Sequence, residues 1–261
     1  MAYTFISGAT GGIGKAFARE CAKRGYDLFI TGRSESKLLE LKQSILLDYS
    51  VKIDYFACDL SSESSRKAML SYLEEKGYTF DRILNVAGVD IQKGFLDYTE
   101  QKLLFQMRVN CESTVALTHA LLRRREKVTE VLTVASMSGA SPMPYFALYS
   151  ATKAMLINFF TAMHYELKDF GVKVTVVMPG GVPTRPDIIE DIKGQGLWGR
   201  LSQKSPEFVA RKSLDKLKKN KLKYIPGGFN KFLNVVMAIM PKRIVLRFIK
   251  NRWKKQTKDA F

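Results

Sequence analysis

The chain has few of the residues that bind metal ions or form disulfides. Its 261 residues include three cysteines and two histidines. Cys21, Cys58 and Cys111 are odd in number and far apart, which predicts free thiols in a reducing compartment. His119 and His164 have no cysteine or carboxylate cluster beside them at metal-ligand spacing, and both fall in segments of helical period. We therefore expect structural histidines and no metal site.

Long apolar runs are missing as well. The longest unbroken run, VVMAIM at 235–240, is far shorter than the ~20 residues of a membrane-spanning helix. The first residues, MAYTFISG, lead directly into an apolar strand and lack the basic and apolar regions of a secretory signal. No proline- or glycine-rich linker divides the chain. We therefore expect a cytoplasmic protein with one main domain, either free or peripheral on a membrane surface.

Apolar segments of strand length alternate with longer segments of helical period. The strand-like segments are YTFIS, LFIT, KIDYFA, RILNVA, EVLTVA and KVTVVM. Repeated strand–helix units predict a parallel sheet covered by helices on both faces. A helix near 206–218 and a short strand at 223–225 would add a seventh strand. The expected fold is a doubly wound α/β Rossmann fold of about seven mostly parallel strands.

A glycine-rich turn, SGATGGIGKAFA, follows the first strand and opens the first helix. Gly8 permits a tight turn, Gly12 lets the backbone approach a diphosphate, and Gly14 lets the helix pack close to the sheet. The spacing is G-x3-G-x-G, which differs from the commoner G-x-G-x-x-G pattern. Thr10 and Ile13 lie in the same turn and belong to the expected cofactor site. The alternative is a turn that only connects strand to helix.

The end of the second strand favours one nicotinamide cofactor over the other. A cofactor with a free ribose 2′-hydroxyl usually meets an acidic residue ~20 residues after the glycines. Here the strand ends in Gly32 and Arg33. Because a guanidinium pairs with a 2′-phosphate, the sequence favours NADP(H), with an exposed surface arginine as the alternative.

The third and fourth strands also end in residues suited to a cofactor. Asp59 is expected either to accept a hydrogen bond from the adenine amine or to cap the next helix, and Leu60 follows it. NVAG at 85–88 closes the fourth strand with small residues over which a cofactor can lie. The expected cofactor residues of this loop are Asn85, Ala87 and Gly88.

Tyr149 and Lys153 form the strongest candidate for a catalytic pair. Four residues are about one helical turn, so both side chains stand on one face of a helix. The same spacing occurs after Tyr72 and Tyr98. Only Tyr149 has a serine, Ser136, thirteen residues before it at the end of the fifth strand, and only this pair opens the following helix. The context therefore predicts a catalytic pair.

In this order and spacing, the motifs resemble the short-chain dehydrogenase/reductase family up to about residue 228. The matching elements are the glycine turn, NVAG, VNCES with Asn110, Ser136, YSATK and PGGVPT at 179–184. The resemblance implies that Tyr149 is the general acid/base and Ser136 holds the substrate oxygen. It also implies that Lys153 binds the nicotinamide ribose and that Asn110 holds a water in a proton relay.

The same resemblance adds cofactor residues after the sixth strand. It implies that Pro179, Gly180, Val182 and Thr184 hold the nicotinamide amide and the diphosphate. The NADP(H) cofactor would exchange hydride with a carbonyl carbon while Tyr149 supplies or removes the proton. A phenol has a reference pKa near 10, and we expect a nearby lysine cation and the oxidised nicotinamide to lower the pKa of Tyr149.

Two features depart from the family pattern. Ser7 stands where the family more often has threonine. The C-terminal end, GGFNKFLNVVMAIMPKRIVLRFIKNRWKKQTKDAF, replaces the family's frequent strand closed by a glycine pair. We therefore expect a homodimer in place of the common tetramer. The domain would cover 1–228, and 229–261 would be a basic amphipathic extension packed on it or flanking it.

The positive charge is concentrated in this C-terminal segment. The net charge is +17, and residues 201–261 hold 17 of the 42 basic but 3 of the 25 acidic residues. A helix over 242–255 would place Ile244, Val245, Phe248, Ile249 and Trp253 on one face. It would either lie on an anionic membrane surface, cover the substrate cleft or form a subunit interface. No nucleic-acid-binding module is recognisable, so we expect no nucleic-acid partner.

Residues 185–205 lie where the family places its substrate lid, and Leu197 and Trp198 among glycines fit a mobile apolar flap. Similar tails occur in the 17β-hydroxysteroid dehydrogenase and 3-oxoacyl reductase branch. The predicted function is NADP(H)-dependent reduction of a ketone, or oxidation of a secondary alcohol, on an apolar substrate such as a steroid or 3-oxoacyl compound. The alternatives are a reductase of small soluble carbonyls and a non-catalytic NADP(H)-binding sensor or scaffold.

Overall fold

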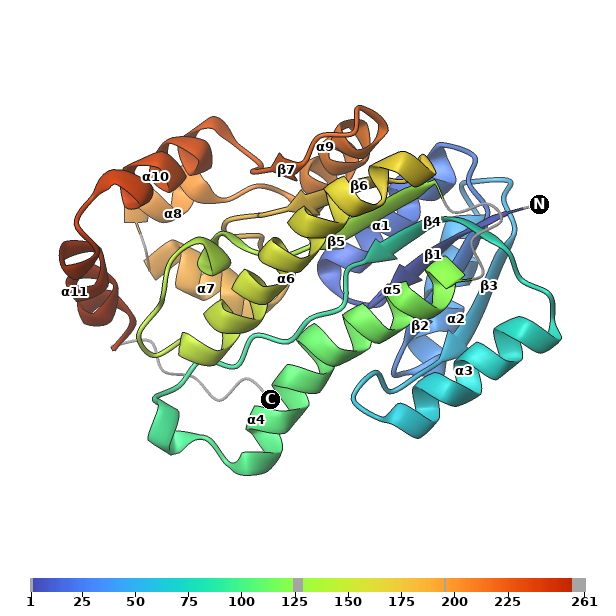
Figure 1. Cartoon of the computed structure of the whole chain (residues 1–261), viewed down its shortest axis with the longest axis horizontal. Helices are drawn as coiled ribbons and strands as arrows, with labels where there is room; N and C mark the ends of the chain where they lie inside the picture. The colour runs from blue at the N-terminus through green and yellow to red at the C-terminus, as the bar shows by residue number, and fades with distance from the viewer. Residues whose placement is uncertain (1, 124–128, 195, 255–261) are drawn as a thin grey trace.

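A computed structural model describes residues 2–123, 129–194 and 196–254. Seven strands in these residues form one sheet (Figure 1). The strands are β1 Tyr3–Ser7, β2 Leu28–Gly32, β3 Ile53–Ala57, β4 Phe80–Asn85, β5 Glu130–Val134, β6 Lys173–Val177 and β7 Lys223–Tyr224. Their order is β3-β2-β1-β4-β5-β6-β7, and every neighbouring pair is parallel. The expected doubly wound Rossmann fold is confirmed.

Helices cover both faces of this sheet. Their bounds are α1 Gly12–Lys23, α2 Glu35–Leu46, α3 Glu63–Glu75, α4 Glu100–Met107, α5 Ser113–Arg123, α6 Ala147–Glu166, α7 Pro186–Gly194, α8 Gly196–Ser202, α9 Pro206–Lys218, α10 Gly228–Ile239 and α11 Lys242–Trp253. Short helical turns lie at η1 Phe95–Asp97, η3 Met137–Ala140 and η4 Lys168–Phe170. α1, α2 and α9 pack on one face, and α3, α5 and α6 pack on the other.

Strand alternation produces the two cores. Ile6 of β1 packs with α1 and α9, whereas its neighbour Phe5 packs with α3 and α5 on the opposite face. Both side chains are fully buried. Burying one such side chain contributes about 1.5–3 kcal/mol to stability. Because both faces of the sheet are buried, successive strand residues are apolar, which explains the near-continuous apolar strand segments in the sequence.

The helical segment that follows β4 is interrupted. α4 and α5 are separated by a π-helical turn, η2 Arg108–Glu112, which contains Asn110. π-helical turns are rare and often mark functional positions. Residues 124–128 lie outside the described part of the chain.

The last two helices follow β7. α10 begins at Gly228, the last residue expected in the main domain. The division at 228/229 stays a prediction. No helix among the described residues has both the length and the apolar character needed to cross a bilayer. Residues 255–261 lie outside the described part of the chain.

Candidate active site

The loops after β1 and β4 pack against each other at the carboxyl edge of the sheet. Gly8 has a φ of +66°, and a Cβ atom on it would lie 2.6 Å from the Cα of Ala87. Ser7 Oγ accepts hydrogen bonds from the N–H groups of Val86 and Ala87 at 3.2 and 3.3 Å. The direction of winding switches between β1 and β4, which is where doubly wound proteins bind ligands.

The first helix begins beside the loop after β6. A Cβ on Gly12 would lie 2.5 Å from the Cβ of Thr184, and Val182 of the same loop is buried. The Pro179 carbonyl accepts from the N–H of Met137 at 2.9 Å. A Cβ on Gly180 would lie 2.8 Å from the Nδ2 of Asn230 in α10. The structure thus brings the predicted residues of the glycine turn and of PGGVPT together.

Arg33 is exposed at the end of β2. Its guanidinium lies 5.8 Å from the centre of the Phe105 ring. Within the described part of the chain it forms no ion pair with a carboxylate. Thr10 of the glycine turn lies beside Gly32, since a Cβ there would be 3.0 Å from Thr10 Oγ1. Arg33 is therefore adjacent to the glycine turn and free to pair with an anion.

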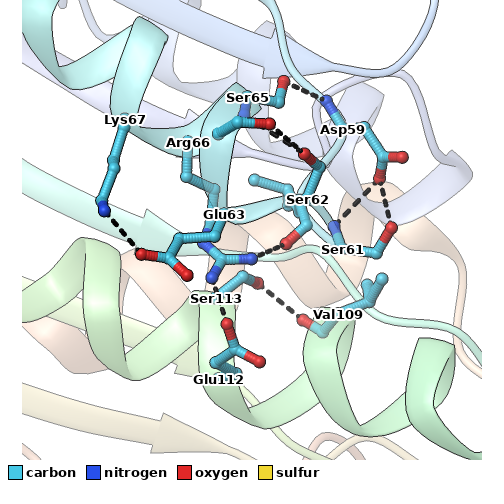
Figure 2. Close-up of polar contacts among 12 residues, drawn as sticks. Asp59, Ser61, Ser62, Glu63, Ser65, Arg66, Lys67, Val109, Glu112 and Ser113 are labelled. Atoms are coloured by element: carbon cyan, nitrogen blue, oxygen red, sulfur yellow. Dashed lines mark hydrogen bonds and ion pairs between the residues drawn. The ribbon is translucent and has the colours of Figure 1, made fainter.

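Asp59 does not cap α3, which removes one of its two expected roles. Its Oδ1 accepts from the backbone N–H and the hydroxyl of Ser61 at 2.9 and 2.8 Å (Figure 2). Ser62 is the cap, because its Oγ accepts from the N–H of Ser65 at 3.2 Å. Leu60 is buried. Asp59 remains exposed at the sheet edge, as an adenine contact requires.

Arg66 connects this loop to the π-helical turn. Its guanidinium donates to the carbonyl of Leu60 and pairs with the carboxylate of Glu112 in η2 (Figure 2). The Arg66 side chain is nearly buried, whereas Glu112 is half exposed. This pair ties the start of α3 to the segment that carries Asn110.

Asn85 has a structural role through its side chain. Its Nδ2 donates to the hydroxyls of Thr118 in α5 and Thr133 in β5 at 2.8 and 3.2 Å. The residue is 2 % exposed. Its Oδ1 is buried without a hydrogen-bond partner among the described residues, and its cofactor contact stays a prediction.

Lys153 is buried below the NVAG loop. It is 3 % exposed, and its Nζ donates to the Val134 carbonyl at 3.0 Å. A Cβ on Gly88 would lie 3.0 Å from this Nζ, so the glycine leaves space above the ammonium. Burial lowers the pKa of Lys153 to about 8.

Asn110 joins the NVAG loop to the catalytic helix. Its Oδ1 accepts from the N–H of Val89 at 2.8 Å, and its Nδ2 donates to the Val89 carbonyl at 2.9 Å. The same Nδ2 donates to Thr152 Oγ1 in α6 at 3.0 Å. Both amide hydrogens are thereby used, and the predicted water contact stays a prediction.

Tyr149 and Lys153 lie one turn apart in α6, as expected. The Lys153 Nζ lies 5.7 Å from the centre of the Tyr149 ring. Ser136 lies close enough to the Tyr149 phenol to lower its pKa, and its own hydroxyl donates to Ser138 Oγ and accepts from the N–H of Ser138, both at 3.1 Å. The three residues predicted to form the catalytic group therefore come together.

The expected lowering of the Tyr149 pKa is wrong for the chain alone. Burial raises this pKa most, and the Asp90 charge raises it further. Ser136 and the charge of Arg185 lower the Tyr149 pKa, but not enough to cancel the effect of burial. The protonated phenol is therefore the stable form at neutral pH.

Sequence reasoning missed an ion-pair network beside Tyr149. Arg185 Nη1 lies 3.0 Å from Asp90 Oδ1, and its Nη2 lies 3.0 Å from Asp187 Oδ2. Asp90 follows NVAG closely, and Arg185 directly follows PGGVPT. The sequence signal was that Asp90 and Arg185, of opposite charge, follow two loops expected at the same edge of the sheet, which would have predicted the ion pair.

The expected lid, 185–205, contains α7 and α8. Both ends are held, because Arg185 pairs with Asp90 of the loop after β4, and the N–H of Lys204 donates to the Gly181 carbonyl of the loop after β6 at 3.1 Å. Leu197 is exposed in the middle. The Trp198 side chain and residue 195 lie outside what the structure describes.

Sequence reasoning also missed an aromatic stack that reaches the catalytic helix. Phe146 stacks on Tyr149 with ring centres 4.4 Å apart. On its other side lies Trp253 of α11, 5.5 Å away and nearly parallel. The C-terminal helix therefore packs beside the candidate active site.

The sheet order and the residues at its carboxyl edge define a doubly wound α/β protein of the Rossmann type. Residues 2–189 match the family model described as short chain dehydrogenase. The chain belongs to the short-chain dehydrogenase family.

Two curated relatives illustrate its place in the family. A very-long-chain 3-oxoacyl-CoA reductase of Kluyveromyces lactis is 31% identical over 186 residues, which are 68% of this chain and 54% of that protein. The human inactive hydroxysteroid dehydrogenase-like protein 1 is 33% identical, over 70% of this chain and 56% of that protein. The chain spans about half the length of these relatives.

Solved structures share nearly the whole fold. One from work on 7β-hydroxysteroid dehydrogenase stereoselectivity has a TM-score of 0.86 and 26% identity, covering 95% of this chain and 96% of that chain. The L-sorbose reductase of Gluconobacter frateurii, solved with NADPH and L-sorbose, has a TM-score of 0.76 and 21% identity, covering 87% of this chain and 95% of that one. The second likeness concerns the fold alone.

Proposed function

We propose that the protein is an NADP(H)-dependent oxidoreductase that reduces a ketone, or oxidises a secondary alcohol, on an apolar substrate. The main support is the convergence of Ser136, Tyr149 and Lys153 where the sheet winding switches. A buried lysine, a phenol and a serine hydroxyl at one ligand-binding edge suit proton transfer to or from a carbonyl oxygen.

The residues at this edge fit a dinucleotide. α1 has no side-chain cap at its N-terminus, so its first N–H groups can receive a diphosphate. The glycine turn would hold the diphosphate, and Asp59 with Leu60 would hold the adenine. The residues proposed for the nicotinamide half are Ala87, Gly88, Asn110, Tyr149, Lys153, Pro179, Gly180, Val182 and Thr184.

Arg33 supports the preference for NADP(H). Its exposed guanidinium beside the glycine turn suits a ribose 2′-phosphate. We expect Arg33→Asp to raise the KM for NADPH at least about tenfold, because one charge-assisted contact is lost and a like charge is introduced. The KM for NADH should change little. Equal changes for both cofactors would remove this support.

The nicotinamide supplies or accepts hydride when it is bound, and the side chains handle the proton. Tyr149 would donate its proton to the substrate oxygen, and Ser136 would donate a hydrogen bond to the same oxygen. Lys153, held by the Val134 carbonyl, would orient the ribose and place a positive charge near the phenol.

An apolar substrate is supported by the lining of the site and by the relatives. Phe146 and Trp253 form an aromatic stack against Tyr149, and Leu197 of the lid is exposed. The K. lactis relative is named as a reductase of very-long-chain 3-oxoacyl-CoA, and the first structural neighbour concerns a hydroxysteroid dehydrogenase. A steroid or a 3-oxoacyl compound is therefore the proposed substrate class.

Two other functions were expected as alternatives. A small soluble carbonyl would not need the aromatic stack of Phe146 and Trp253 beside Tyr149. A sensor or scaffold without turnover draws support from the name of the human relative, which is called inactive. The presence of Asn110, Ser136, Tyr149 and Lys153 together favours an enzyme. The homodimer and the peripheral membrane contact through 242–255 stay predictions, and residue 255 lies outside the described part of the chain.

NADPH consumption against a panel of steroid ketones, 3-oxoacyl thioesters and small diketones tests this proposal, with NADH as the comparison. We expect turnover with one apolar class and a clear preference for NADPH. Turnover confined to small diketones would favour the soluble-carbonyl function. NADPH binding without turnover of any panel member would favour the sensor.

A further inference from the structure

The last two helices expose a row of large apolar side chains. Phe232, Val235 and Ile239 of α10 are 61, 56 and 76 % exposed, and Ile244 and Phe248 of α11 are 54 and 63 % exposed. We call these five residues the C-terminal surface. Five large exposed apolar side chains on two successive helices indicate an interaction site.

The apolar face expected for α11 is divided between two environments. Val245 and Ile249 are each 6 % exposed and pack inward, and Trp253 stacks on Phe146. Ile244 and Phe248, expected on the same face, point outward instead. The inner half of the face therefore fixes α11 to the body beside the candidate active site. The outer half remains available to a partner.

Basic residues accompany the C-terminal surface. Segment 231–254 contains no acidic residue. Its exposed cations are Lys231, Lys242, Arg243, Arg247, Lys250 and Lys254. Arg243 and Arg247 line a shallow groove together with Ile244 and Phe248. Large exposed apolar side chains next to basic residues, in a segment without acidic residues, suit the boundary between the acyl chains and the acidic headgroups of a bilayer.

The C-terminal surface is connected to the candidate active site. Asn230 at the start of α10 donates to the carbonyls of Ser202 and Pro226 at 2.8 and 2.7 Å and lies against Gly180. α11 reaches the catalytic helix through Trp253. Figure 1 shows α7, α8, α10 and α11 at one end of the molecule, away from α2 and α3. The helices that carry the C-terminal surface thus contact both the expected lid and the residues beside Tyr149.

We propose that the C-terminal surface binds an anionic lipid bilayer, with its apolar side chains inserted and its cations on acidic headgroups. The proposal deepens the proposed function, because an apolar substrate would then reach the lid directly from the membrane. A second copy of the chain suits this surface less well. A twofold interface would bring identical sets of cations together, and like charges repel.

Co-sedimentation of the full chain with phosphatidylcholine vesicles, with and without phosphatidylserine, tests the proposal. We expect binding to the anionic vesicles, weak binding to the neutral ones, and loss of binding at high salt. Arg243→Glu with Arg247→Glu should weaken binding at least about tenfold, since each basic residue near the surface contributes about 1 kcal/mol. Ile244→Ser with Phe248→Ser should also weaken it several-fold.

Leu47→Ser and Lys23→Glu serve as matched controls, because Leu47 just after α2 and Lys23 in α1 are exposed away from the C-terminal surface and should leave binding unchanged. Equal binding to both vesicle types, or no change in the C-terminal variants, would overturn the proposal. A dimer in sedimentation velocity that these variants dissociate would assign the surface to a second copy instead. Tyr149→Phe should bind vesicles like the wild type, so this result and the activity of the enzyme are read separately.

Discussion

At the residue scale, the candidate site holds two ionisable groups in poorly solvated positions. Burial lowers the pKa of Lys153 to about 8 and raises that of Tyr149. Both shifts disfavour the charged form of the group. A protonated phenol is ready to act as the acid in ketone reduction, whereas alcohol oxidation needs its phenolate. Oxidation should therefore increase with pH over the alkaline range.

The buried Lys153 cation should cost stability at neutral pH. The change of its pKa from 10.5 to about 8 corresponds to a penalty on the order of 3 kcal/mol below pH 8. Lys153→Met removes the penalty but loses one hydrogen bond, worth about 1 kcal/mol. We predict an inactive variant that is about 1–2 kcal/mol more stable in urea unfolding at pH 7.

The pH dependence of this gain provides the control. In the wild type the unfolded chain binds more protons than the folded chain between pH 8 and 10.5, so wild-type stability rises relative to the variant in that window. The advantage of Lys153→Met should therefore shrink as pH rises toward 10.5. A variant that is less stable than the wild type at pH 7 would contradict the assignment of Lys153 as a buried cation.

Asp90 should set the pH at which Tyr149 loses its proton. Its carboxylate raises the Tyr149 pKa, so Asp90→Asn should lower that pKa. We predict that the alkaline rise of alcohol oxidation shifts to lower pH by several tenths of a unit. Asp187→Asn is the matched control, because Asp187 pairs with the same Arg185 without contributing to the Tyr149 shift. Equal shifts in both variants would point to the loss of Arg185 pairing instead.

Single-residue roles were only partly predictable from the sequence. Ser136, Tyr149 and Lys153 could be placed because strand ends and helical spacing fix their positions. The buried hydrogen bonds of Asn85 could not, since they depend on threonines in α5 and β5. The expected effect of lysine on Tyr149 was wrong because desolvation depends on packing that spacing does not reveal.

At the element scale, the C-terminal helix has two different sides. Its inner side packs Trp253 on Phe146 next to Tyr149, and its outer side exposes Phe248. Helical periodicity predicted the apolar face of α11 but not which part of it the body covers. The π-helical turn was equally unpredictable, because Asn110 is held by Val89 and Thr152, which are distant in sequence.

Trp253→Ala should weaken the binding of the apolar substrate. The variant loses the ring that holds Phe146 beside Tyr149, a contact worth about 0.5–1.5 kcal/mol, and we expect the looser site to raise KM for that substrate several-fold. The KM for NADPH should stay the same, because Trp253 stacks on Phe146, which is not among the predicted cofactor residues. In the absence of vesicles, Phe248→Ala on the outer side of α11 should leave both constants unchanged. A matching rise of KM in both variants would show that α11 acts only through its overall stability.

At the scale of the whole molecule, the excess positive charge lies near the C-terminus, whereas the candidate active site is formed by residues of the sheet edge. The strands and the first nine helices build the sheet and its carboxyl edge, whereas the last two helices add cations without acidic residues. The doubly wound sheet of about seven mostly parallel strands was predictable because strand–helix alternation permits few topologies. Assembly was not, since it depends on exposed surfaces that the sequence pattern only outlines.

The rate of NADPH oxidation by wild type and Tyr149→Phe, with the best ketone of the panel, tests whether Tyr149 is the proton donor. NADPH affinity is measured in parallel by titration. We predict that kcat falls at least about a hundredfold, as expected for removal of a general acid, and that NADPH affinity is unchanged. A variant that keeps wild-type turnover would contradict the assignment of Tyr149 as the proton donor.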